Sequence, residues 1–123
     1  MQQTLLDTSF ILTCIKQKID FFEEIKLMGV QILIPKQVID EIKRIIESKK
    51  KLHFKEDAKL ALKLLEKNLF KKIDLKNKNT DKGIVKFAKK DKKISIATLD
   101  KELKDKIPNQ KLIIRQRKRL EII

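Results

Sequence analysis

The chain has 123 residues and carries 31 Lys and Arg against 17 Asp and Glu, a formal charge of +14. The length predicts one domain over residues 1–123, and the 41% hydrophobic content suffices for a core, which excludes a disordered chain. A single cysteine (Cys14) and a single histidine (His53) exclude an internal disulfide and a Cys/His zinc site, and no apolar run reaches the roughly 18 residues that cross a bilayer.

Short apolar runs alternate with longer helical patterns along the chain. Five strands are predicted, at residues 4–6, 31–35, 70–75, 93–97 and 111–114. Five helices are predicted between them, at residues 10–24 (with a further piece that stops at Gly29), 37–48, 56–68, 80–90 and 101–106. Such alternation is typical of α/β proteins, so we expect a doubly wound, parallel five-stranded sheet with helices on both faces.

Four acidic residues fall at or just past the carboxyl ends of the predicted strands, where ligands bind in open α/β sheets. Asp7 ends the first strand, Asp100 follows the fourth, Asp81 opens the preceding helix, and Glu41 lies one turn into the helix after the second strand. Taken singly, the three Asp residues are good helix N-caps, and Glu41 could be a solvated residue like its neighbour Asp40. Helix phase alone leaves open which of these two neighbours faces the edge.

Taken together, the four acids point to a metal site. Like charges that lie close together cost stability unless a cation neutralises them. Oxygen-only ligands suit Mg²⁺ or Mn²⁺, and one or two such ions would activate water for phosphodiester cleavage.

The same residues stand in motifs that resemble those of PIN domain nucleases, in the same order. The motifs are LLDTSF at 5–10, VIDEI at 38–42, DKGIV at 81–85 with Ala88, and ATLD at 97–100. The tail IRQRKRL at 114–120 resembles that of an archaeal subgroup, which is similar to the ribosomal RNA processing nuclease of the eukaryotic small-subunit processome. The resemblance implies a sheet order of 3-2-1-4-5, Mg²⁺ or Mn²⁺ held by Asp7, Glu41, Asp81 and Asp100, and endonucleolytic cleavage of RNA.

The chain departs from the family pattern at three positions. Ser9 and Leu99 stand where Asn is common, and Lys82 replaces a frequent acid. The four main acids remain, so activity is expected. Beside them, Ser9 and Thr98 are candidates to support the metal ligands; Thr98 could bond a ligand carboxylate or equally serve the next helix N-terminus.

The positive charge predicts a polyanionic partner: nucleic acid first, an acidic membrane surface or acidic protein second. Arg115, Arg117 and Arg119, joined by Lys118, form the expected RNA-binding segment 115–119, because arginine pairs bidentately with phosphate. In a strand-like extension the three arginines would share one side. The alternative to RNA binding is a solvated tail without a partner. With no Trp or Tyr, no base-stacking platform is evident, so binding should depend on backbone charge and fall steeply with salt.

We therefore expect a cytoplasmic, metal-dependent endoribonuclease, with ribosomal RNA processing as the context that the resemblance implies. No protein nucleophile is expected, because Cys14 falls on an apolar helix face and His53 in a Lys-rich loop. Two alternatives stay open: a PIN-type ribonuclease toxin with an antitoxin partner, and a non-catalytic RNA-binding or ribosome-assembly module. A phosphoacceptor regulatory domain fits poorly, since the first strand ends in one acid only. The resemblance also leaves a homodimer open.

Overall fold

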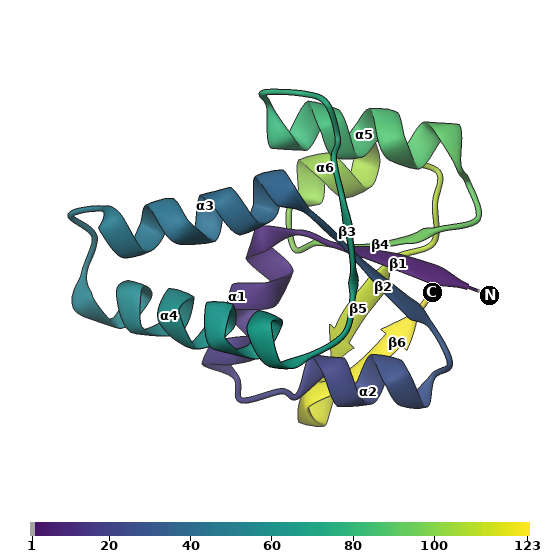
Figure 1. Cartoon of the computed structure of the whole chain (residues 1–123). Helices are drawn as coiled ribbons and strands as arrows, with labels where there is room; N and C mark the ends of the chain where they lie inside the picture. Colours follow the sequence, from purple (N-terminus) through teal and green to yellow (C-terminus); the bar gives the residue numbers. More distant parts are fainter. Residues whose placement is uncertain (1) are drawn as a thin grey trace.

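A parallel four-stranded sheet in the order β3-β2-β1-β4 forms the centre of the fold (Figure 1). The computed structural model describes residues 2–123, apart from the side chain of Arg117. The strands of this sheet are β1 (Gln3–Leu6), β2 (Gln31–Pro35), β3 (Lys71–Ile73) and β4 (Ser95–Ala97). The parallel sheet and the order of its first four strands are as expected.

The fifth predicted strand does not join this sheet as a full member. β5 (Leu112–Arg115) pairs antiparallel with β6 (Arg119–Ile122), a strand that the sequence did not predict. β5 approaches β4 through one isolated parallel bridge, between Ile96 and Lys111. The five-stranded order 3-2-1-4-5 is therefore corrected to four strands plus a hairpin, because β5 pairs along its length with β6 and meets β4 only at this bridge.

The basic segment 115–119 turns back on itself, so it is not the strand-like extension in which its three arginines would share one side. The short 3₁₀ helix η1 (Gln116–Lys118) joins the two hairpin strands, and Lys118 adopts a left-handed φ of 61°. As a result Arg115 and Arg119 are opposite each other in the hairpin instead of following one another along one strand.

Within residues 2–123, six α-helices surround the sheet, and the chain from residue 10 to 24 forms parts of two of them instead of one. They are α1 (Thr8–Lys16), α2 (Phe21–Leu27), α3 (Lys36–Glu47), α4 (Leu52–Lys67), α5 (Thr80–Lys90) and α6 (Lys101–Asp105). The break after α1 contains Lys18 at a φ of 60°, and Asp20 caps α2 by accepting a hydrogen bond from the Glu23 N–H at 3.1 Å.

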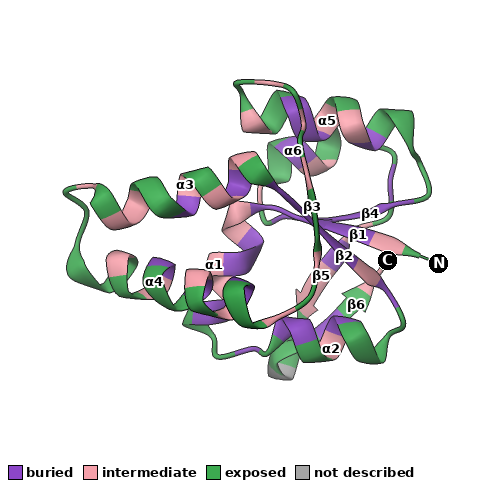
Figure 2. Ribbon diagram, viewed as in Figure 1, coloured by how far each residue is buried: buried purple, intermediate pink, exposed green. Residues whose placement is uncertain are grey.

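Two apolar cores lie on opposite faces of the sheet, and Figure 2 shows the buried residues on the strands and on the helix faces turned toward them. Leu6 packs with α1 to α4 and the hairpin, whereas Leu5 packs with α5 and α6. Successive side chains of a strand point to opposite faces, so β1 serves both cores. Cys14 is buried in the first core, as predicted. No helix among residues 2–123 is long and apolar enough to span a membrane.

Candidate active site at the carboxyl edge of the sheet

The candidate site lies where β1 and β4 end and helices begin (Figure 1). These strands are direct neighbours, and the Asp7 N–H continues their pairing by donating to the Ala97 carbonyl at 2.9 Å. Asp7 follows β1 and caps α1, while Asp100 follows β4 and caps α6. Asp81 lies in the first turn of α5, and Glu41 lies in α3. The parallel topology thus gathers all four predicted acids at one edge.

Asp7 is the most enclosed of these acids, with 5% of its surface exposed. Its Oδ1 accepts a hydrogen bond from the Thr8 N–H at 2.8 Å, and its Oδ2 accepts one from the Thr98 hydroxyl at 2.8 Å. Burial raises the pKa of the Asp7 carboxyl, the two hydrogen bonds lower it, and the negative charges of Asp81 and Glu41 raise it further. The net direction is upward, so the surroundings disfavour the anion.

Glu41 faces the same edge, which answers the question that helix phase left open. The Thr8 hydroxyl donates a hydrogen bond to Glu41 Oε1 at 2.8 Å, and the Glu41 side chain is half-buried. Asp40, its neighbour, is exposed. Thr8 therefore contacts two acids, with its backbone N–H on Asp7 and its hydroxyl on Glu41.

Thr98 and Ser9 connect the ends of β1 and β4. The buried Thr98 donates its hydroxyl proton to Asp7 and accepts a hydrogen bond from the Asp100 N–H at 3.1 Å. The Thr98 hydroxyl therefore contacts both the Asp7 carboxyl and the backbone at the start of α6. Ser9 Oγ lies 3.4 Å from Asp7 Oδ2 and 3.3 Å from Thr98 Oγ1, and it accepts from the Leu99 N–H at 3.1 Å.

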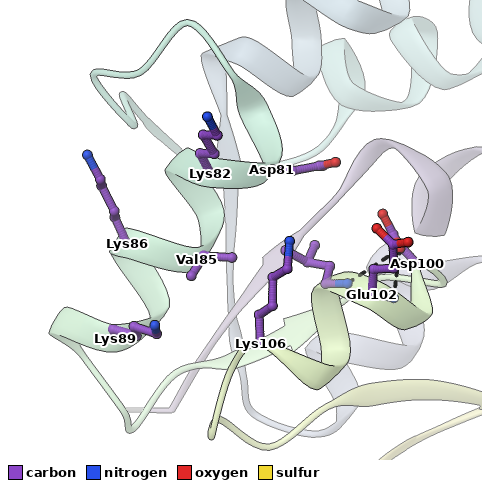
Figure 3. Close-up of a pocket in the computed structure, with 9 residues that line it drawn as sticks. Asp81, Lys82, Val85, Lys86, Lys89, Asp100, Glu102 and Lys106 are labelled. Atoms are coloured by element: carbon purple, nitrogen blue, oxygen red, sulfur yellow. Dashed lines mark hydrogen bonds between the residues drawn. The ribbon is translucent and has the colours of Figure 1, made fainter.

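Asp100 and Asp81 lie at the same end of a cleft between α5 and α6 (Figure 3). Asp100 Oδ1 accepts hydrogen bonds from the N–H groups of Glu102 (3.0 Å) and Leu103 (3.4 Å), as expected of an N-cap. Asp81 does not cap its helix, because Asn79 Oδ1 takes that position by accepting from the Lys82 N–H at 3.0 Å. Capping therefore accounts for Asp100 but not for Asp81.

We call this space the α5–α6 cleft; its volume is about 330 Å³. The residues that line it are Asp81, Lys82, Val85, Lys86, Lys89, Asp100, Glu102, Leu103 and Lys106.

The four carboxylates approach one another but do not surround a common point. Among residues 2–123, no three Asp, Glu, His or Cys side chains are close enough to hold one metal ion. The chemistry of the donor set still fits a divalent cation, because all four candidates are carboxylates, the ligands that Mg²⁺ and Mn²⁺ prefer. The charges of Asp81 and Glu41 also act on Asp7, so a cation bound there would remove a repulsion that the fold otherwise carries.

The predicted RNA-binding segment lies apart from the α5–α6 cleft. The hairpin packs through Leu112 and Leu120 into the core that contains α1 to α4, on the opposite face of the sheet from α5 and α6. Arg115 forms an ion pair with Glu121, with Nε 2.6 Å from Oε2, while Lys118 and Arg119 are exposed. The side chain of Arg117, the fourth residue of the predicted set, is outside the described part of the chain.

Sequence reasoning overlooked two features of this region. Thr8 was passed over, although a hydroxyl directly after a strand-end Asp is well placed to contact the next helix. The lysines that line the α5–α6 cleft were not recognised as one group, although Lys82, Lys86 and Lys89 recur at the spacing of one helix face.

Comparison with known proteins finds relatives that match almost the whole chain. The model of the family described as PIN like domain matches residues 4–119. Ribonuclease VapC4 of Methanocaldococcus jannaschii is 30% identical over 128 residues, which cover 99% of this chain and 97% of that protein.

Two solved structures resemble the fold. The structure of the PIN domain endonuclease Utp24 has a TM-score of 0.76 at 26% identity, over 98% of this chain and 92% of that one. VapBC2 from Rickettsia felis, bound to a promoter DNA fragment, has a TM-score of 0.54 at 14% identity, over 89% of this chain and 98% of that one, and shows the fold alone. With the family model spanning almost its whole length, the chain belongs to the PIN domain family.

Proposed function

We propose that this protein is a metal-dependent endoribonuclease whose site consists of Asp7, Glu41, Asp81 and Asp100. The observation that carries the proposal is the buried Asp7 carboxyl, which hydroxyl and amide groups hold beside a second acid without any basic partner among the described ion pairs. The likeness to proteins named ribonuclease and endonuclease supports RNA phosphodiester bonds as the substrate.

The chain's own residues prepare the carboxylates for this reaction. Thr98 and the Thr8 N–H keep Asp7 in a fixed position and oppose the effect of burial on its pKa. Thr8 also holds Glu41 against the β1–α1 turn. A Mg²⁺ or Mn²⁺ ion held by the four acids would supply an activated water and stabilise the leaving oxygen, so the mechanism needs no protein nucleophile.

The proposal is tested by incubating the purified protein with structured and unstructured RNA in Mn²⁺, in Mg²⁺ and in chelator. Asp7→Asn and Asp100→Asn should abolish cleavage, whereas Asp40→Asn, which changes an exposed acid one residue from Glu41, should keep it. Cleavage that persists in chelator or in both substituted proteins would refute the carboxylate mechanism. RNA binding with no cleavage under any condition would favour the non-catalytic module.

For the biological context we propose ribosomal RNA processing, on the resemblance of the tail at 114–120 to that of the archaeal subgroup. A toxin of a toxin–antitoxin pair is the second candidate, which the likeness to VapC4 favours. Expression in a bacterial host separates the two. Growth arrest that a small protein encoded beside this gene relieves would indicate a toxin, and specific cleavage of a ribosomal RNA precursor would indicate processing. A cytoplasmic location and a homodimer belong to the same proposal, and size-exclusion chromatography tests for the homodimer.

A further inference from the structure

The α5–α6 cleft combines an apolar floor with a positively charged rim. Val85 is half-buried and points into the space between the two helices (Figure 3), and the buried Leu103 lines the opposite wall. The volume of about 330 Å³ is at the lower end of the roughly 300–1,000 Å³ range of small-molecule pockets. A space of this size and polarity suits one nucleotide base with its sugar and is too small for a base-paired duplex.

Charge is unevenly distributed along the cleft. The acids that line it are Asp81, Asp100 and Glu102, which lie at the first turns of α5 and α6. Along the rest of α5, Lys82, Lys86 and Lys89 follow at spacings of four and three residues, which places them on one side of the helix over about 10 Å.

The lysines of the cleft outnumber its three acids. Lys106 adds a fourth cation from the end of α6. The ion pairs of the described residues join Lys36 to Asp74 and Arg115 to Glu121, so none of them includes a cleft lysine. A row of cations that leads away from a cluster of acids matches a phosphodiester chain whose reacting phosphate lies at the acidic end.

We propose that the α5–α6 cleft binds the single-stranded RNA segment next to the cleaved bond, with one nucleotide ring against Val85 and the following phosphates along Lys82, Lys86 and Lys89. This inference rests on the proposed ribonuclease function for the placement of the cut. Lysine acts as a point charge and apolar contact is indifferent to base identity, so the cleft selects unpaired strands and not a sequence.

The first test measures binding in chelator, where no metal-dependent cleavage occurs. Fluorescence anisotropy of a labelled single-stranded oligoribonucleotide compares the wild type with Lys86→Gln/Lys89→Gln. Loss of one phosphate contact to a single strand lowers the slope of log affinity against log salt concentration by about 0.7. At 0.1 M salt this corresponds to about fivefold weaker binding, and the loss of two contacts corresponds to about 25-fold weaker binding. The control, Lys59→Gln/Lys63→Gln, removes the same charge from exposed positions of α4. Unchanged affinity in the cleft variant, or an equal loss in the control, overturns the proposal.

The second test locates the strand by thiol protection. Val85→Cys introduces a thiol in the floor, while the native Cys14 is buried and its pKa is raised to about 12, so it stays unreactive toward maleimide. Single-stranded RNA should slow the labelling of Val85→Cys at least tenfold and leave that of Leu60→Cys, on α4, unchanged. Equal protection by a duplex, or none by the single strand, contradicts a single-strand cleft.

The two proposals can fail separately. If Mn²⁺-dependent cleavage requires Asp7 but replacement of the cleft lysines leaves RNA affinity unchanged, the cleft assignment is wrong and the proposed nuclease function is retained. If replacement of the lysines weakens RNA binding but the wild type cleaves no RNA, the proposed nuclease function is wrong and RNA binding in the cleft is retained.

Discussion

Replacement of Asp7 by Asn is expected to stabilise the metal-free protein at neutral pH while it abolishes activity. The Asp7 side chain is almost fully buried, and burial together with the charges of Asp81 and Glu41 makes its anion unfavourable. Asparagine has the same shape without the charge. Its carbonyl oxygen can still accept from the Thr8 N–H, and its amide can donate to the Thr98 hydroxyl, so both hydrogen bonds have a replacement.

The expected gain is about 1 kcal/mol, within the roughly 0.5–2 kcal/mol that a single stabilising substitution commonly yields. For a chain of 123 residues this corresponds to a rise in Tm of about 4 °C. The pH dependence has a definite sign. The folded-state pKa of Asp7 lies above the ordinary value of 3.8, so its ionisation costs stability progressively as pH rises from 3.8 through that raised pKa. The advantage of Asp7→Asn should therefore be absent at the acid end and largest near pH 7.

Thermal unfolding in chelator, recorded from pH 4 to pH 7.5, measures this difference, with Asp40→Asn as the control at an exposed acid. A variant that is less stable than wild type at pH 7, or an advantage that shrinks as pH rises, would refute the argument from burial. Addition of Mn²⁺ should then reverse the order. An ion at 100 times its Kd stabilises the wild type by about 2.7 kcal/mol, and Asp7→Asn should gain far less.

Three other substitutions follow from the same contacts. Thr98→Val removes a hydroxyl that bonds a buried carboxylate and should cost about 2–3 kcal/mol in chemical unfolding, whereas Thr98→Ser keeps the hydrogen bond. Glu41→Gln should lower Mn²⁺-dependent cleavage about 100-fold or more, and Asp40→Asn should leave it unchanged in the same assay. Gly83→Ala would bring a Cβ to 2.9 Å from Leu75 Cβ, so circular dichroism melts should show a loss of about 1–3 kcal/mol.

The sheet and the place of the acids were predictable because both follow from strong local patterns. Buried parallel strands consist of continuous apolar runs such as residues 31–35, and these runs ended close to where the strands end. Once the strands are known, the parallel topology brings their carboxyl ends to one edge. Asp7 directly follows β1, and Asp100 lies three residues after the end of β4, so both could be placed from the sequence.

The C-terminal hairpin could not be predicted in the same way, because its turn has no recognisable sequence signal. A left-handed φ is usually met by Gly or Asn, yet here Lys118 adopts it. Lys18 does the same in the break between α1 and α2. In both places the surrounding packing selects the backbone conformation, since Leu120 joins the core after one turn and Ile19 after the other. The chain contains 27 Lys and two Gly, so its composition does not indicate where turns with a left-handed φ occur.

Hydroxyl groups support the acidic edge, although the chain contains so many lysines. This feature best connects the charge of the protein with its proposed chemistry. A lysine beside Asp7 would neutralise its charge and lower the pKa that burial raises. Instead the contacts come from Thr8, Ser9 and Thr98, and the described ion pairs lie elsewhere, at Lys36 and Arg115. Hydroxyl groups orient a carboxylate without cancelling its charge, so the edge keeps its attraction for a divalent cation while the excess of lysine remains available to the RNA.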